Sequence, residues 1–101
     1  MEVHNMPKLD KQRRLKIPLD FRDELSWVLP AKVALCYDCQ TNMIYICEKD
    51  KSTSELVICF RTIDAKGRFI FPTECIRLLN ASDEDFLILF LQNKKIFIKK
   101  A

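Results

Sequence analysis

The chain has 101 residues, of which 49% are hydrophobic and 31% charged, with one glycine and four prolines. This balance is typical of one folded domain and excludes disordered and collagen-like proteins. The net charge of +3 does not by itself indicate a nucleic-acid partner, and no apolar run reaches the roughly 20 residues of a membrane-spanning helix. We therefore expect a single domain over residues 1–101 without membrane contact.

The chain begins with Met-Glu-Val-His-Asn, which lacks the basic start and apolar core of a signal peptide. Its five cysteines are an odd number in a chain without a secretory signal, which indicates reduced thiols. These features predict a cytoplasmic protein.

The first predicted element is a strand–turn–strand unit that the chain contains twice. Residues 9–18 read Leu-Asp-Lys-Gln-Arg-Arg-Leu-Lys-Ile-Pro, and residues 63–72, 54 positions later, read Ile-Asp-Ala-Lys-Gly-Arg-Phe-Ile-Phe-Pro. Both copies carry an aliphatic residue, Asp, three residues, Arg, a short extended run and Pro. Such self-similarity indicates a duplicated structural unit.

A short helix is predicted after each proline, over residues 19–25 and 73–79. Proline is tolerated at a helix start, because its missing N–H removes no helical hydrogen bond there. Asp20 and Glu74 fall in the first turns, where the helix dipole favours a negative charge.

Each helix is followed by a predicted β-hairpin. In the first copy, β-branched and aromatic residues at 33–37 and 44–47 flank a polar turn, and in the second copy those at 86–91 and 96–98 do the same. Both copies therefore have the order strand, turn, strand, short helix, hairpin.

The repeats are separated by a polar linker at residues 48–55, and a strand over 56–63 opens the second copy. We place repeat 1 at about residues 7–47 and repeat 2 at about 56–100. A unit of about 45 residues is too small to close its own core, so we expect two interleaved units with one shared core.

The duplicated Asp-x-x-x-Arg unit resembles the swapped-hairpin AbrB family of DNA-binding regulators. Residues 61–72, Arg-Thr-Ile-Asp-Ala-Lys-Gly-Arg-Phe-Ile-Phe-Pro, are close to that family's signature. Two such units per chain also resemble the bacterial MraZ regulators, although there is no room here for the long helical segment between the MraZ repeats. The first copy matches less well, since Arg13 stands where the second copy has Gly67.

This resemblance implies a mainly β fold with short helices, namely a swapped-hairpin β-barrel made of two pseudo-symmetric βαβ-hairpin repeats. It also implies a transcriptional regulator that binds double-stranded DNA at the nucleoid, as a single chain or as a homo-oligomer. Asp10 and Asp64 are expected to brace the turns rather than to contact DNA. The positions that match the family's DNA-contacting residues are Lys8, Arg14, Arg22, Arg61, Arg68 and Arg77.

The charge pattern supports DNA contact on chemical grounds as well. Six basic residues stand against two acidic ones between Lys8 and Arg22, and arginine presents a planar set of donors that suits phosphates and guanine edges. Two alternatives remain open. The charged face is simply solvated, or the Asp-x-x-x-Arg pairs are salt bridges that only hold the turns.

The alternative function is a protein-interaction module of the same fold, such as an antitoxin-like partner binder or a scaffold. The weaker first copy and the small net charge favour this alternative. Steep salt dependence of duplex binding distinguishes the two functions, because a protein partner need not show it.

The pair Cys36 and Cys39 forms a C-x-x-C motif, but no second Cys/His pair completes a zinc site. A redox dithiol is expected at a helix start, whereas this motif enters a hairpin turn. Partly buried free thiols are therefore expected.

Trp27, with Phe21, Val28 and Leu29, is expected to pack the first helix against the sheet, with a protein contact as the alternative.

Catalysis is not predicted. Gly67 is the only glycine, which excludes a Gly-rich phosphate loop, and His4 is the only histidine. No Ser-His-Asp set is evident. We expect no enzymatic activity, no cofactor, no metal and no small-molecule substrate.

Overall fold

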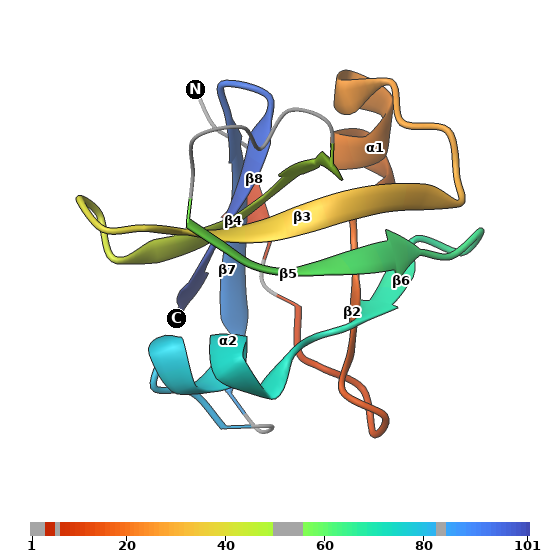
Figure 1. Ribbon diagram of the computed structural model, residues 1–101. Helices are drawn as coiled ribbons and strands as arrows, with labels where there is room; N and C mark the ends of the chain where they lie inside the picture. The colour runs from red at the N-terminus through yellow and green to blue at the C-terminus, as the bar shows by residue number, and fades with distance from the viewer. Residues whose placement is uncertain (1–3, 6, 50–55, 83–84) are drawn as a thin grey trace.

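A computed structural model describes residues 4–5, 7–49, 56–82 and 85–101, which form a mainly β structure with two short helices (Figure 1). The first half contains β1 (His4–Asn5), β2 (Arg14–Lys16), α1 (Leu19–Leu25), β3 (Ala31–Asp38) and β4 (Met43–Glu48). The second half contains β5 (Leu56–Ile63), β6 (Arg68–Ile70), α2 (Thr73–Leu78), β7 (Leu87–Gln92) and β8 (Lys95–Lys100).

The predicted helices and hairpin strands are confirmed to within two residues at each end. β1 precedes residue 7, where repeat 1 is predicted to begin, and pairs with β7. Residues 50–55 of the predicted linker lie outside the described residues. No helix among the described residues is long and apolar enough to cross a membrane.

Two prolines set where the helices begin. Pro18 and Pro72 are the N-caps of α1 and α2, and both have extended backbone with ψ near 145°. Their carbonyls accept the N–H groups of Arg22 and Ile76, each at 3.2 Å. Because proline has no N–H to donate to a ladder, each proline also limits the short strand before it.

The two repeats exchange their first strands. The larger sheet has the strand order β1-β7-β8-β4-β3-β5, so β1 pairs with the hairpin of the second half and β5 with that of the first. The pair Leu35↔Cys59 in β3–β5 has its repeat equivalent, 54 positions away in each strand, in the pair Leu89↔Asn5 of β7–β1. Each half therefore completes the sheet of the other.

Strand registers follow a pseudo-two-fold axis. The central pair of the β2–β6 ladder is Leu15↔Phe69, and that of the β4–β8 ladder is Tyr45↔Phe97. Exchanging the two repeats leaves both central pairs in place and interchanges the flanking ones, with equivalent positions 54 apart in the ribbon and 52 apart in β4 and β8. These are Arg14↔Ile70 with Lys16↔Arg68, and Ile44↔Ile98 with Ile46↔Ile96.

The two hairpins differ in turn length. The β3–β4 register ends at Asp38↔Met43 and leaves four residues in the turn, whereas β7–β8 ends at Gln92↔Lys95 and leaves two. Those two, Asn93 and Lys94, have φ angles of 53° and 61°, as a two-residue type I′ hairpin turn requires.

The expected β-barrel is not closed by hydrogen bonds among the described residues. β1 and β5 are the edges of the six-stranded sheet, and β2 and β6 pair only with each other. This two-stranded ribbon stays short because each strand is limited by a tight turn at one end and by a proline at the other. The architecture is therefore a six-stranded sheet with a separate ribbon.

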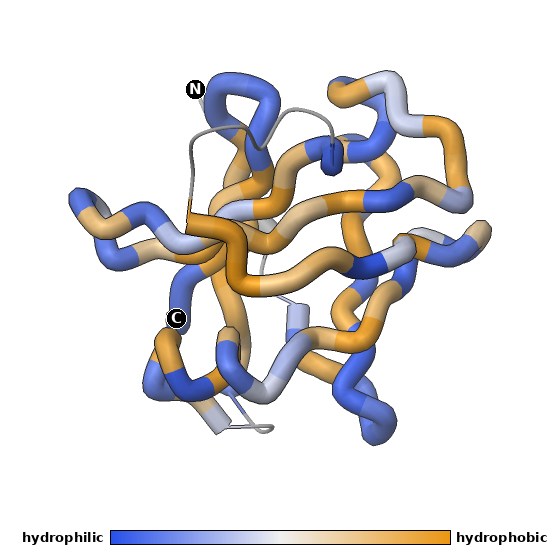
Figure 2. The backbone as a smooth tube through the Cα atoms, viewed as in Figure 1, coloured by the Kyte–Doolittle hydropathy of each residue, from blue (hydrophilic) through white to orange (hydrophobic). Residues whose placement is uncertain are grey.

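The main core contains residues from the sheet, the ribbon and both helices. Side chains alternate along the strands, so Ile44 and Ile46 face this core while Tyr45 and Cys47 form part of a second buried cluster. Figure 2 shows hydrophobic residues along the strands and hydrophilic ones at the turns.

The predicted packing of the first helix against the sheet is correct for Phe21, Trp27 and Leu29, which lie in or against the main core. It is wrong for Val28, whose exposed fraction is 83%. The chain leaves α1 through Ser26 in the left-handed conformation. Neighbouring side chains then alternate, so Val28 faces solvent between two residues that face the core.

The turn before each ribbon strand contains one residue with a left-handed backbone. Arg13 has a φ of 60° and its repeat equivalent Gly67 a φ of 81°. A Cβ atom on Gly67 would lie 2.9 Å from Cζ of Arg22. The Arg22 guanidinium thus packs directly on the glycine, which joins α1 of the first half to the turn of the second.

Gly67→Ala is expected to lower the free energy of unfolding by about 1–2 kcal/mol, because an L side chain is strained at this φ. The matched control is Arg13→Gly, which removes such strain and should leave the chain no less stable than the wild type. Urea denaturation followed by circular dichroism measures both. Equal destabilisation by the two substitutions would contradict this account of the turns.

Candidate nucleic-acid interface

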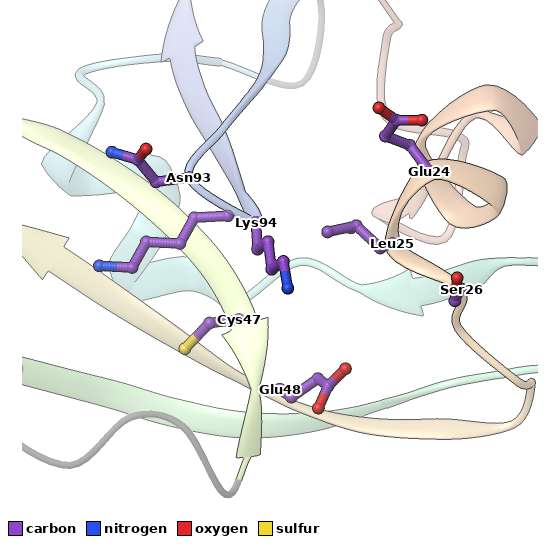
Figure 3. A pocket seen from close by; sticks show the side chains of 8 residues that line it. Glu24, Leu25, Ser26, Cys47, Glu48, Asn93 and Lys94 are labelled. Carbon is purple, nitrogen blue, oxygen red and sulfur yellow. The ribbon is translucent and has the colours of Figure 1, made fainter.

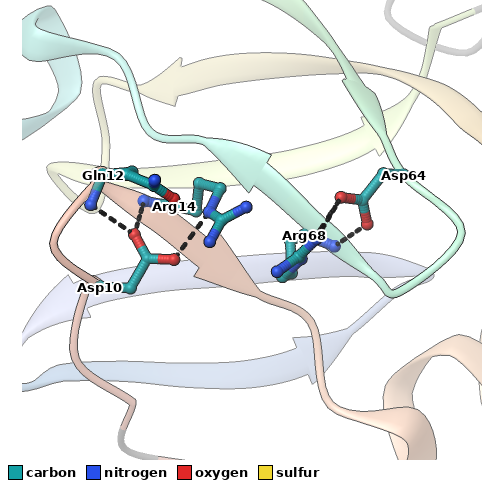
Figure 4. Close-up of polar contacts among 5 residues, drawn as sticks. All are labelled: Asp10, Gln12, Arg14, Asp64 and Arg68. Atoms are coloured by element: carbon teal, nitrogen blue, oxygen red, sulfur yellow. Dashed lines mark hydrogen bonds and ion pairs between the residues drawn. The ribbon is translucent and has the colours of Figure 1, made fainter.

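Each ribbon strand begins with a turn that an aspartate holds (Figure 4). Oδ1 of Asp10 accepts the backbone N–H groups of Gln12 and Arg14, each at 2.8 Å, and Oδ2 accepts Nε of Arg14 at 2.7 Å. One carboxylate therefore fixes both the turn and the arginine that follows it.

The second copy repeats this arrangement. Oδ1 of Asp64 accepts the N–H groups of Lys66 and Arg68, each at 2.9 Å, and Oδ2 accepts Nε of Arg68 at 3.3 Å. The bond from Lys66, two residues on, makes this an Asx-turn. The spacing of four residues places both the backbone N–H and the guanidinium of Arg68 within reach of the same carboxylate.

The same contacts lower the pKa of both carboxyl groups. The largest cause is the backbone N–H of Arg14 for Asp10 and that of Arg68 for Asp64, and the arginine charges act in the same direction. Both carboxyls therefore stay ionised into mildly acidic solution and keep their arginines paired.

The ribbon presents an outward face with three cationic side chains. Leu15 and Phe69 face the core, so the residues on either side of each face outward. The two turns lie at opposite ends of the ribbon because β2 and β6 are antiparallel, and Figure 4 shows Arg14 and Arg68 between the two aspartates. We define the ribbon face as the outward residues Arg14, Lys16, Arg68 and Ile70.

Positive charge is concentrated around this face. Residues 8–16 and 61–68 carry eight basic side chains against two acidic ones, while the rest of the chain has nine basic and twelve acidic residues. The small net charge of the whole chain therefore conceals a strongly basic region beside a net acidic remainder.

The other predicted contact residues have structural partners or lie elsewhere. Nε of Arg61 donates to the Ile70 carbonyl at 3.1 Å, and its Nη1 donates to the Phe60 carbonyl at 3.0 Å. Arg61 therefore connects β5 to the backbone of the ribbon strand β6.

Lys8 and Arg22 also take part in packing. Nζ of Lys8 lies 4.9 Å from the centroid of the Phe86 ring, and Arg22 covers Gly67. Arg77 is exposed in the last turn of α2, which Figure 1 shows well to the side of the ribbon. Of the six predicted positions, the ribbon face thus contains Arg14 and Arg68 but not the other four.

Lys16 belongs to the ribbon face but is not among the predicted contact residues. Its exposed side chain lies opposite Arg68 in the ladder. The signal for it is strand alternation, which puts Lys16 on the same face as Arg14. Its repeat equivalent is Ile70, so a search for positions that are basic in both copies does not find it.

A pocket of about 370 Å³ lies away from the ribbon face, between the end of α1, the end of β4 and the β7–β8 turn (Figure 3). Glu24 and Glu48 line it together with Lys94 and Lys95. These opposite charges balance, so the pocket offers no net charge with which to select an ionic ligand.

The thiols and carboxylates do not suggest a metal site. The five cysteines, all within the described residues, carry reduced thiols, and burial raises the pKa of the Cys75 thiol to about 12. Within the described part of the chain, no three His, Cys, Asp or Glu residues gather closely enough to hold a metal ion.

No protein-family model matches the chain, and no curated protein matches it in sequence.

Acidification is expected to weaken the two turns. A carboxyl with a lowered pKa stabilises the fold at neutral pH, and this contribution is lost as pH falls below about 3.9 through the folded-state value. The free energy of unfolding should therefore fall as the pH is lowered below the unfolded-state pKa of about 3.9, and Asp10→Asn/Asp64→Asn should make that fall shallower.

The measurement is urea denaturation at a series of pH values, with carboxyl-carbon NMR titration to assign each pKa. Asp38 and Asp85 also have lowered pKa values, from backbone N–H groups of Gln40 and Ser82, so part of the pH dependence should remain. An unchanged pH dependence in the double variant would contradict the assignment.

Proposed function

We propose that the chain is a DNA-binding transcriptional regulator of the swapped-hairpin AbrB and MraZ type, acting in the cytoplasm at the nucleoid. The observation that carries this proposal is the pair Arg14 and Arg68, each oriented by its own aspartate on one outward face of the ribbon. The exchange of β1 and β5 and the pseudo-two-fold registers support the swapped-hairpin assignment.

The ribbon suits the major groove of a duplex. That groove is about 12 Å wide and admits a two-stranded β-ribbon. In this proposal Arg14 and Arg68 reach base edges at two points related by the pseudo-two-fold axis. Lysines of the ribbon region, including Lys8 and Lys16, contact phosphates and supply most of the affinity.

Orientation of the arginines favours base reading over purely electrostatic contact. Asp10 holds Arg14 through Nε, which leaves the two terminal nitrogens for a base or phosphate acceptor. A guanidinium that is already held in place loses less conformational entropy on binding than a freely rotating one. The exposed fraction of the Arg14 side chain is 31%, so it is restrained and still accessible.

A protein-binding role is the second candidate. β5 is an edge strand of the sheet, and its Leu56 and Phe60 have exposed fractions of 60% and 49%. An exposed apolar edge strand can accept an extended peptide as an additional strand.

Arg14→Gln/Arg68→Gln is expected to weaken duplex binding at least tenfold and to make its salt dependence shallower. Wild type that neutralises about six phosphates should show a log–log salt slope of about −5. Fluorescence anisotropy with a mixed-sequence duplex pool, at several salt concentrations, measures both quantities.

The matched control for this experiment is Lys94→Gln/Lys99→Gln, which removes the same charge from the β7–β8 hairpin and should retain most of the affinity. Equal losses of duplex affinity in the two double variants would show that the effect comes from net charge alone. Absence of wild-type binding even at low salt would overturn the proposal and favour the protein-binding candidate.

Asp10→Asn/Asp64→Asn is expected to change affinity and selectivity in opposite directions. The asparagine Oδ1 can still accept the two backbone N–H groups, but the carboxylate oxygen that orients each arginine is gone. Two negative charges also disappear, so non-specific affinity should rise. Discrimination between a selected duplex and a scrambled one should fall by about 1–3 kcal/mol for each misdirected arginine.

Competition titrations of the two duplexes at one salt concentration measure this ratio. A double variant that keeps wild-type discrimination would show that the aspartates hold only the turns.

A further inference from the structure

The ribbon face is symmetric in its backbone but not in its side chains. Exchanging the repeats maps Arg14 onto Arg68 and Lys16 onto Ile70. One half of the face therefore carries two cations, and the other carries one cation and an isoleucine.

Ile70 is unusual for its surroundings. Its exposed fraction is 58%, and it is paired directly with Arg14 in the middle of the most basic part of the chain. Its backbone is held from both sides, by the ladder to β2 and by Nε of Arg61 on its carbonyl at 3.1 Å. A β-branched side chain with few χ1 options is thus presented outward at a fixed position.

Charge follows the same asymmetry. Residues 8–16 carry five basic side chains, whereas the equivalent residues 62–70 carry two, and each span has one aspartate. The first repeat therefore supplies most of the positive charge of the ribbon region, and Ile70, opposite Arg14, is presented next to that charge.

An apolar side chain has one specific partner in the major groove, the C5-methyl group of thymine. We propose that Ile70 contacts a thymine methyl group, so that the chain binds its duplex in one orientation. In that orientation the end of the ribbon with Lys16 and Arg68 lies on one half-site, and the end with Arg14 and Ile70 lies on the thymine-containing half-site. This inference rests on the proposed function and deepens it, because it names a residue that determines specificity and the base that it reads.

The experiment selects bound duplexes from a random pool and then replaces each thymine of the selected site by uracil, which removes only the methyl group. For the wild type, uracil at one or two positions within one half of the site should weaken binding about fourfold, as expected for burial of one methyl-sized group. The other half should be insensitive.

Two variants test the assignment to Ile70. Ile70→Ala should fold normally, because the side chain is exposed, and should bind the thymine and uracil duplexes equally. Lys16→Ala should weaken binding to all duplexes alike and keep the fourfold uracil effect.

The possible failures are distinguishable. If wild type binds duplexes with a steep salt slope but uracil has no effect, or has the same effect in Ile70→Ala, the proposal about Ile70 is wrong and the regulator function stands. If wild type binds no duplex at low salt, both are wrong.

Discussion

Neither repeat of this chain contains enough residues to bury its own hydrophobic face. Because the repeats exchange strands, both hydrophobic faces are buried in one shared core. β1 and β5 each complete the sheet of the other half, and the β2–β6 ribbon exists only because each half supplies one strand. Leu15 and Phe69 lie buried under the ribbon. The outward cations next to them are therefore fixed by the same packing that joins the two halves.

The repeat made most of the fold predictable. The equivalent segments at residues 9–18 and 63–72 predict both turns and both helix-starting prolines. Each sequence pattern appears in both copies, so a pattern present in one copy by chance is recognised by its absence from the other. The position of β1, by contrast, was not predicted. It has two residues and no periodic pattern, and it is a strand only because β7 offers an edge far away in the sequence.

The candidate site was predictable where it is local. An aspartate four residues before an arginine predicts the turn contacts, since both partners lie in one short segment. Contacts between the halves were not predictable. The position of Arg22 over Gly67 and the bond from Arg61 to the Ile70 carbonyl depend on how the halves pack. The position of Lys16 opposite Arg68 likewise depends on the strand register between the halves.

Two differences between the repeats are linked by packing. Gly67 has Arg13 as its equivalent, and Arg22 has Ile76. Where an arginine covers the turn, a Cβ atom would displace its guanidinium, and glycine avoids that displacement. In the other half Ile76 packs against the main core instead, so the equivalent turn position can carry a side chain. It carries an arginine there, despite the cost of a left-handed backbone at a residue other than glycine. The weaker first copy is thus the half whose turn carries a cation, and the arginine that stands in place of glycine contributes positive charge beside the ribbon.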